Sequence, residues 1–273
     1  MRWNHVPPHG MMLYHDPMPH LLAIDIGNTT TQIGAFDGER LVFSFRLAST
    51  HTRTPDEAAL LLRHVLSDAG LQAGSIQGAV ACSVVPVLTP VITAAVESTC
   101  RVIPMVVSHH LKLAVRLAVP FPEQVGADRI ANAEGFWVEH HCAGIVVDFG
   151  TATTFDVISG DGAYKGGAIS PGLETSAERL SQKAAQLFKV GIETPSSPIG
   201  ATTEDALKSG LYFGGIGAVD EIVRRISGAM DGKPKVVATG GLASVISRDS
   251  QTIQAVDPIL TLKGLRAIYL ANR

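Results

Sequence analysis

The sequence predicts an α/β fold of two similar domains, and three observations support this. One short pattern occurs twice, strand and helix patterns alternate around both copies, and a length of 273 residues suits two domains. The first copy lies at residues 21–31 and the second at residues 144–154. Each copy is an apolar run that ends in Asp, with a Gly two residues later and hydroxyl side chains after it. The repetition predicts one matched hairpin in each domain.

Each copy is expected to form a strand, a tight turn and a second strand. Alternation of apolar and polar residues resumes after both turns, at Ile33 and Ala35 in the first and at Phe155 and Val157 in the second. The Gly lets the backbone approach a ligand, and turn amides with Thr hydroxyls can hold phosphate oxygens. A carboxylate at the end of a strand can hold Mg²⁺, usually through water. Two such hairpins facing each other would hold a nucleoside triphosphate.

Five further elements are expected in the first half. A third strand should lie at residues 41–47, followed by a helix that opens with Thr54-Pro55-Asp56-Glu57. Pro in the first turn and acidic side chains near the positive end of the helix dipole favour this start. A buried strand at 78–85, a helix from 86 to about 99 and a short strand at 102–107 should follow.

The second half is expected to repeat this order after a helix at residues 126–141. Because that helix leads directly into the second hairpin, we place the domain boundary near residue 140, between an N-terminal domain (21–140) and a C-terminal domain (141–273). The later elements are expected to be a Gly- and Pro-rich connection at 166–172, a helix, a long helix at 204–226, a strand at 236–238 and a last helix from about Pro258.

Composition excludes several classes of protein. Hydrophobic residues make up 46% of the chain and charged residues 17%, which is typical of a globular protein. The net charge of −3 argues against a general binder of nucleic acid or of anionic membranes, so neither is expected as a partner. The most apolar stretch, residues 79–96, is interrupted by Pro86 and Pro90 and is not expected to span a membrane.

Two features bear on the ends and the location of the chain. Residues 1–20 are rich in His, Pro and Met and lack the apolar segment of a signal peptide, so we expect a disordered lead-in. The three cysteines, Cys82, Cys100 and Cys142, have no metal-binding spacing. They fit reduced thiols and therefore favour a cytoplasmic protein.

Phosphate binding by a P-loop is excluded, because the sequence contains no Gly-x-x-x-x-Gly-Lys-Ser/Thr. A Rossmann-type Gly-x-Gly-x-x-Gly after a strand is also missing. The two Asp-x-Gly hairpins and a late Thr239-Gly240-Gly241 instead resemble the acetate and sugar kinase, Hsp70 and actin superfamily. This resemblance implies two ribonuclease-H-like (actin-like ATPase) domains with a nucleotide cleft between them.

Five motifs in one order narrow the resemblance to a family. They are Asp25-Ile26-Gly27-Asn28-Thr29, Gly126-Ala127-Asp128-Arg129, residues 148–156, residues 166–172 and Thr239-Gly240-Gly241. Together they resemble type III pantothenate kinase, from about residue 21 to the C-terminus. The resemblance implies ATP-dependent phosphorylation of pantothenate to 4′-phosphopantothenate, the first step of coenzyme A biosynthesis.

The same resemblance implies roles for particular residues. ATP would contact Asp25, Ile26, Gly27, Asn28, Thr29, Thr30, Thr31 and Gln32 of the first hairpin and Thr151 of the second. Pantothenate would contact Gly126, Ala127, Asp128, Arg129 and Thr203, with Asp128 as the proton acceptor. Asp148 would lie by a monovalent cation, K⁺ or NH₄⁺, and Asp25 by Mg²⁺, directly or through water. A homodimer is also implied.

Asp128 can also be argued from chemistry. Phosphorylation of a primary alcohol needs an oxygen nucleophile aimed at the γ-phosphorus and an acceptor for its proton. An Asp in the first turn of a helix is held ionised by the dipole and the amides, and it can accept that proton within hydrogen-bond reach. An acid that only stabilises the helix is an equal alternative on the residues alone. Arg129 could clamp a substrate carboxylate or lie as a surface charge.

Simpler roles exist for other predicted site residues. Asp25 and Asp148 could cap strand-to-turn transitions, although two matched hairpins favour ligand binding. Thr202 and Asp205 have the spacing of a helix-capping pair, which would leave Thr203 free to face a ligand.

Two positions depart from the family pattern. Ala201 stands where the family usually has Lys, and Val119 stands where a Tyr is common. Substrate contacts through these two positions are therefore not expected. Alternatives to the kinase are a phosphatase or nucleotide hydrolase on the same fold, or a catalytically impaired homologue acting as a regulatory accessory protein. An actin-like filament is disfavoured by the short chain.

Overall fold

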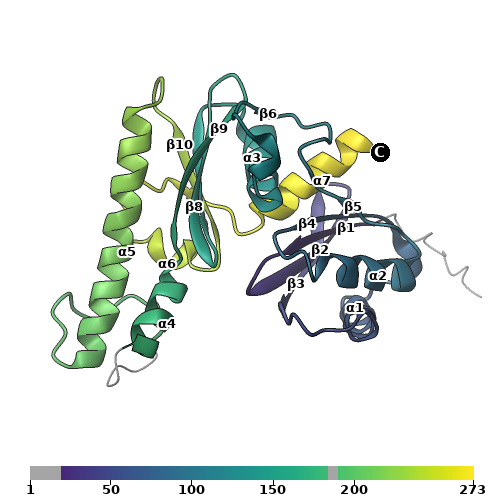
Figure 1. Ribbon diagram of the computed structural model, residues 1–273, viewed down its shortest axis with the longest axis horizontal. Helices are drawn as coiled ribbons and strands as arrows, with labels where there is room; N and C mark the ends of the chain where they lie inside the picture. Colours follow the sequence, from purple (N-terminus) through teal and green to yellow (C-terminus); the bar gives the residue numbers. More distant parts are fainter. Residues whose placement is uncertain (1–19, 184–189) are drawn as a thin grey trace, which may run out of the picture.

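The computed structural model describes residues 20–183 and 190–273, which form two β-sheets with helices around and between them (Figure 1). Of the predicted lead-in, residues 1–19 lie outside the described residues, and His20 is the first residue of a strand. Strands and helices alternate in both halves, so the predicted α/β class is confirmed.

The first sheet contains the first predicted hairpin. Its strand order is β3-β2-β1-β4-β5. The strands are β1 (His20–Ile26), β2 (Thr30–Asp37), β3 (Arg40–Ala48), β4 (Ile76–Ser83) and β5 (Met105–Val106). β1 pairs antiparallel with β2 and parallel with β4, so it lies between these two strands inside the sheet. The predicted hairpin and third strand are confirmed.

Two helices, α1 (Pro55–Asp68) and α2 (Thr89–Cys100), cover the outer face of the first sheet. α1 begins as predicted: the Thr54 side chain accepts the Glu57 N–H, and the Thr54 N–H donates to the Glu57 carboxylate at 2.8 Å. This reciprocal pair satisfies two backbone donors that a helix start leaves open. A short 3₁₀ turn, Ala73–Ser75, leads into β4.

The second sheet contains the second predicted hairpin. Its strand order is β11-β10-β7-β8-β9-β6. The strands are β6 (Arg116–Leu117), β7 (Gly144–Phe149), β8 (Ala152–Ile158), β9 (Ala163–Pro171), β10 (Lys235–Gly240) and β11 (Ala255–Val256). β7 and β8 pair antiparallel, and β10 runs parallel to β7 on its other side. The hairpin of the first half is therefore repeated with the same neighbours.

The predicted Gly- and Pro-rich connection at residues 166–172 is wrong, because most of it belongs to strand β9. β9 pairs antiparallel with β8, and this pairing brings the Phe155 carbonyl against Gly167. A Cβ at residue 167 would lie only 1.6 Å from that oxygen. The glycine that suggested a loop therefore permits a close approach between two strands.

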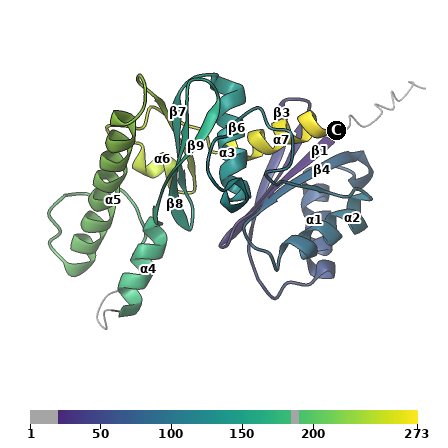
Figure 2. The same cartoon turned by 45° about the horizontal axis from the view of Figure 1, so that its top comes forward.

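Two helices lie between the sheets in both views (Figures 1 and 2). They are α3 (Ala127–His140), preceded by a 3₁₀ turn at Pro122–Gln124, and α7 (Leu260–Asn272). α3 packs Ile130 against the first sheet and Phe136 against the second. α7 crosses back to pack on β1 and β4, although it is the last helix of the chain. The division near residue 140 stays a prediction, and α7 joins the C-terminal segment to the N-terminal half.

The remaining helices belong to the second sheet. They are α4 (Leu173–Lys183), α5 (Thr203–Gly228) and α6 (Ala243–Ile246). α5 confirms the predicted long helix and runs along the outer face of this sheet, away from the first (Figure 1). Within the described part of the chain, no helix combines the length and apolar character required to cross a membrane.

Candidate active site

A cavity of about 660 Å³ lies where the turns of the two hairpins meet. The start of α3 and the end of β10 complete its wall. The predicted site residues that line it are Asp25, Gly27, Asn28, Thr29, Thr30, Gln32, Gly126, Asp128, Arg129, Asp148 and Thr151. The fold therefore brings together most of the residues that the sequence singled out, from segments more than a hundred positions apart.

Four predicted site residues do not line this cavity. Ile26 is fully buried in the core, and Thr31 is buried with its hydroxyl 2.9 Å from the Ser49 hydroxyl. Ala127 is the first residue of α3, and Thr203 is the first residue of α5. A role of these four residues in ligand binding would therefore be indirect, or would require the segments that carry them to be arranged differently.

The two turns touch across the cavity. The hydroxyl oxygens of Thr29 and Thr151 lie 2.9 Å apart and share a hydrogen bond. In each turn the Gly donates its N–H to a carbonyl two or three residues later, at 3.1 Å in both. The two turns thus bring hydroxyls from both hairpins to one place.

Asp25 lies at the end of β1, half-buried beside the cavity. Its Oδ1 accepts a hydrogen bond from the Cys82 thiol at 3.2 Å. Burial raises the pKa of Asp25 to about 7, and the negative charges of Asp128 and Asp148 add to the rise. A carboxyl in this position gains strongly from a nearby cation.

Asp148 is the counterpart of Asp25 at the end of β7 but has a stronger donor. The Asn132 amide donates to its Oδ2 at 2.8 Å, and the Thr261 hydroxyl donates to the Asn132 Oδ1 at 2.7 Å. Burial raises the pKa of Asp148 to about 6, while the hydrogen bond from Asn132 opposes this rise. A chain from α7 through α3 therefore orients the second carboxylate.

Asp128 lies in the first turn of α3, and its negative charge adds to burial in raising the pKa of both turn carboxyls, Asp25 and Asp148. Its Oδ1 accepts the Arg129 backbone N–H at 2.8 Å, and a Cβ at Gly126 would come within 2.5 Å of the same oxygen. Gly126 therefore leaves room for the carboxylate to fold over the helix start. Burial raises the pKa of Asp128, against the lowering effect of this hydrogen bond and of the Arg129 charge.

Arg129 is held in place by a buried carboxylate. Its Nε donates to Asp156 Oδ1 at 2.7 Å, and the Tyr164 hydroxyl donates to the same oxygen at 2.9 Å. The side chain of Arg129 is only 15% exposed, so the surface-charge interpretation is excluded. Within the described residues its Nη2 is buried and has no hydrogen-bond partner. A buried donor without a partner is costly and marks a place where a ligand acceptor would be stabilised.

The donor set fits a Mg²⁺ ion that is held mainly by a nucleotide. No group of three or more His, Cys, Asp or Glu side chains able to hold a metal ion is found in the described ranges. Mg²⁺ usually binds through one or two carboxylates, several waters and the phosphates of a substrate. Asp25 and Asp148 supply hard oxygen donors, and burial, with a smaller contribution from neighbouring carboxylates, raises the pKa of both. A bound cation would favour their charged forms.

Several functional candidates were missed from the sequence. Arg46 lines the cavity from β3, and Asn132 and Asp156 hold Asp148 and Arg129. A signal for Asp156 exists, because a carboxylate between Phe155 and Val157 in a buried strand needs a partner. Nothing local marks Asn132 or Arg46, whose neighbours are set by the packing of distant segments.

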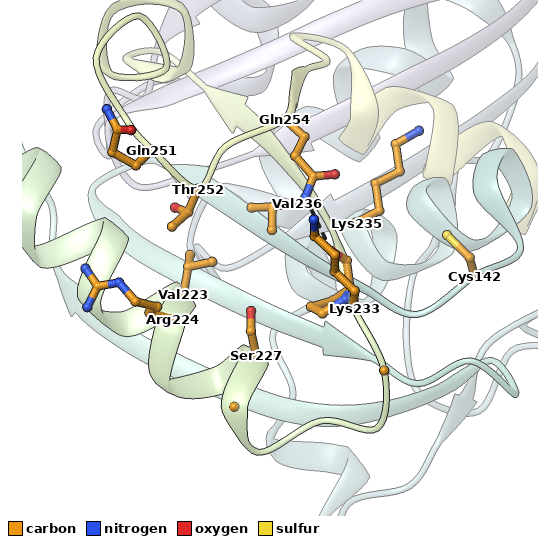
Figure 3. Close-up of a pocket in the computed structure, with 13 residues that line it drawn as sticks. Cys142, Val223, Arg224, Ser227, Lys233, Lys235, Val236, Gln251, Thr252 and Gln254 are labelled. Atoms are coloured by element: carbon orange, nitrogen blue, oxygen red, sulfur yellow. Dashed lines mark hydrogen bonds between the residues drawn. The ribbon is translucent and has the colours of Figure 1, made fainter.

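A second hollow of about 990 Å³ lies between the end of α5 and the start of β10 (Figure 3). The described residues that line it include Arg224, Lys233 and Lys235 but no Asp or Glu. Arg224 is paired with Glu221, and Lys235 Nζ lies 3.3 Å from His140 Nδ1. This hollow therefore lacks the carboxylates that phosphoryl transfer with a metal ion requires, and the first cavity is the candidate active site.

Comparison with known proteins shows a clear family match. A model of the family described as type III pantothenate kinase matches residues 21–225. A relative from Dehalococcoides mccartyi strain CBDB1 of that name is 46% identical over 93% of this chain and 96% of its own length. Another from Geobacter sulfurreducens with the same name is 44% identical and covers 93% and 99%.

Solved structures show the same fold at low sequence identity. A Baf family protein from Campylobacter jejuni matches with a TM-score of 0.56 at 20% identity, over 91% of this chain and 97% of that one. A protein from Sinorhizobium meliloti with a proposed identity of 2-dehydro-3-deoxygalactonokinase matches with a TM-score of 0.57 at 14% identity, over 92% and 96%. The predicted fold of two ribonuclease-H-like domains, as in actin-like ATPases, is confirmed.

Proposed function

The chain belongs to the type III pantothenate kinase family, and we propose that it transfers the γ-phosphoryl group of ATP to the primary hydroxyl of pantothenate. The product would be 4′-phosphopantothenate, formed in the first step of coenzyme A biosynthesis. The observation that carries the proposal is the meeting of the two acidic turns, with Asp128 and Arg129, at one cavity.

ATP would lie with its phosphates between the two turns. The hydroxyls of Thr29 and Thr151 offer donors from both sides. Donors fixed by two rigid hairpins need little reorganisation, which is how such sites stabilise charge on a transferring phosphoryl group. The hydrogen bond between Thr29 and Thr151 would have to exchange for bonds to phosphate oxygens.

The chemical step forms one bond and breaks one. The pantothenate hydroxyl oxygen bonds to the γ-phosphorus, the bond from that phosphorus to the β,γ-bridging oxygen breaks, and ADP leaves. Asp128 is proposed to take the hydroxyl proton. Its raised pKa keeps it closer to the working pH than an ordinary Asp, which makes proton transfer more favourable.

Arg129 is proposed to bind the pantothenate carboxylate. The buried Nη2 is the donor without a partner, and Asp156 fixes the guanidinium by its bond to Nε. An Arg held in this way presents its remaining donors to a carboxylate with little loss of entropy. Thr203 is also proposed to contact pantothenate, but it does not line the cavity of the single chain.

Cations are assigned to the two turn carboxylates. Mg²⁺ is the general requirement of kinases of this superfamily, and we assign it to Asp25, directly or through water. K⁺ or NH₄⁺ is assigned to Asp148. When bound, these ions would neutralise phosphate charge and the mutual repulsion of the carboxylates.

A homodimer in the cytoplasm is proposed as the working form. A Cβ at Gly210, Gly214 or Gly217 of α5 would meet no described atom within 4 Å outside its own helix. A second helix could therefore approach closely there. The three cysteines are free, which agrees with a reducing compartment.

A coupled ADP-release assay tests the proposed function. ADP release should depend on pantothenate and should be faster in K⁺ buffer than in Na⁺ buffer. ATP turnover that does not depend on pantothenate would favour a hydrolase on the same fold. The absence of any turnover, with intact ATP binding, would favour the regulatory alternative.

A further inference from the structure

The cavity has few positive side chains for a site that receives a polyanion. Its acidic lining residues are Asp25, Asp128, Asp148, Glu174 and Glu178. Among the described residues that line it, the cationic side chains are Arg46 and Arg129. ATP brings about four negative charges, so each cation of the chain has a large effect on its binding and reaction.

Of these two described cations, Arg46 is the one available for phosphate. Arg129 is already bonded to the buried carboxylate of Asp156. Arg46 is exposed on β3, and no ion pair or hydrogen bond of its guanidinium occurs within the described residues. A flexible, uncommitted Arg beside a phosphate site can form two parallel hydrogen bonds to phosphate oxygens.

Strand register places Arg46 directly in line with a turn carboxylate. In the first sheet Asp25 lies opposite Gln32, and Gln32 lies opposite Arg46. In the second sheet Asp148 lies opposite Thr154, and Thr154 lies opposite Ile169. Arg46 and Ile169 therefore occupy matched positions, and both line the cavity.

The matched positions differ in chemistry. Ile169 is 63% exposed, so the second sheet presents an apolar surface where the first presents a guanidinium. Arg46 lies in line with Asp25 across the first sheet, and both line the cavity that Asp148 also lines. A single guanidinium is thus placed at the cavity where the γ-phosphate is proposed to lie between the two turns.

We propose that Arg46 contacts the transferred γ-phosphoryl group and stabilises its charge during transfer. This inference rests on the proposed kinase function and assigns a role to the cation on β3, at the position where the second sheet has Ile169. The sequence has no P-loop Lys for this task. Arg46 supplies the missing positive charge from a neighbouring strand.

Two substitutions and a matched control test the assignment. Arg46→Gln removes the charge, and Arg46→Lys keeps the charge but loses the planar pair of donors. Arg40→Gln is the control, because Arg40 lies on the same strand, is exposed, and forms a surface ion pair with Asp37. Each protein is titrated calorimetrically with ATP and with ADP in the presence of Mg²⁺, and kcat and KM are measured for both substrates.

Arg46→Gln should lower kcat/KM for ATP by about 100-fold, as loss of one preorganised donor does in other enzymes. Arg46→Lys should be intermediate. Affinity for ATP should fall more than affinity for ADP, while KM for pantothenate stays within about twofold and Arg40→Gln behaves as wild type.

Two results would overturn the assignment. The first is an Arg46→Gln enzyme within about threefold of Arg40→Gln in kcat/KM for ATP. The second is an equal loss of ATP and ADP affinity, which would place Arg46 at the phosphates that ADP retains. The titrations need no turnover, so they test Arg46 even if wild-type protein fails to phosphorylate pantothenate, which would instead reject the proposed function.

Discussion

The two acidic turns share a sequence pattern but have different surroundings. Among the described residues, the Asp25 side chain receives a hydrogen bond only from the Cys82 thiol, whereas the Asp148 side chain receives an amide hydrogen bond from Asn132, which Thr261 in turn fixes. The pKa of Asp25 is raised to about 7 and that of Asp148 to about 6, in both cases chiefly by burial. The repeated motif thus places a carboxyl at the same position of each hairpin, while partners from distant segments determine how strongly its charged form is stabilised.

The second strands of the two hairpins differ in the same way. Asp156, on β8, follows Thr154 by two positions and anchors Arg129. The matched residue on β2 is Gly34, against which Leu262 of α7 packs. Under the proposed function, the first hairpin would serve phosphate alone and the second also the acceptor substrate.

The largest expected effect concerns Asp128, which acts on both turns. Asp128→Asn should lower kcat by roughly 10²–10⁴ because it removes the proton acceptor, while ATP affinity remains close to wild type. Steady-state kinetics and ATP titration measure the two quantities. Asp68→Asn, which changes an exposed acid on α1, serves as the control. Turnover near wild type in Asp128→Asn would remove the general-base role.

The next effect separates the two turn carboxylates by the ion that each serves. Asp25→Asn should raise the Mg²⁺ concentration needed for half-maximal activity by about 10- to 100-fold, in the range seen for altered metal sites. Asp148→Asn should instead weaken activation by K⁺. Activity is measured while each ion is varied with the other held constant. Unchanged titrations in both variants would show that these ion assignments are wrong.

A smaller effect tests the contact between Asp156 of the second hairpin and Arg129. Asp156→Asn keeps a hydrogen-bond acceptor but loses the charge that holds Arg129, so KM for pantothenate should rise by about tenfold with little change in kcat. The conservative change Arg129→Lys should raise the same KM further, since it loses the planar fork. If kcat falls and KM stays constant, Asp156 does not position a substrate-binding group.

The smallest expected effect is on thermal stability, measured as the Tm of variants at Asp25 and at Asp148. A carboxyl whose pKa is raised on folding contributes stability fully below its unfolded pKa of 3.8 and loses it as the pH rises through the folded value, about 7 for Asp25 and about 6 for Asp148. Without ligands, Asp25→Asn should therefore raise the Tm at pH 8 by about 2–5 °C, and Asp148→Asn by less.

Thermal unfolding at pH 5 and pH 8 measures this difference. The gain of Asp25→Asn should shrink at pH 5, where the wild-type carboxyl is largely protonated. A larger gain for Asp148→Asn than for Asp25→Asn would reverse the comparison and show that the Asn132 hydrogen bond does not stabilise the charged form.

Much of the fold follows from local pattern. The two hairpins, α1 with its capping pair and the long helix α5 all lie where alternation, capping residues and helical periodicity predict them. β9 was missed because glycines that serve close strand packing have the same composition as a loop. The return of α7 to the first sheet depends on long-range packing, which no local window of sequence contains.

The candidate site shows the same limit. The sequence motifs predict the site residues, and most of these line one cavity. Their partners were not identified, because the contacts of Asn132 with Asp148 and of Arg129 with Asp156 connect separate segments. Arg46 illustrates the point, since its position across from Asp25 is fixed by strand register rather than by spacing along the chain.

The most direct test of the account is a crystal structure with a non-hydrolysable ATP analogue, Mg²⁺ and pantothenate. The account predicts that the phosphate chain lies between the turns at Gly27 and Gly150, with the pantothenate hydroxyl next to Asp128. A nucleotide bound elsewhere, for example in the hollow at the end of α5 (Figure 3), would contradict it.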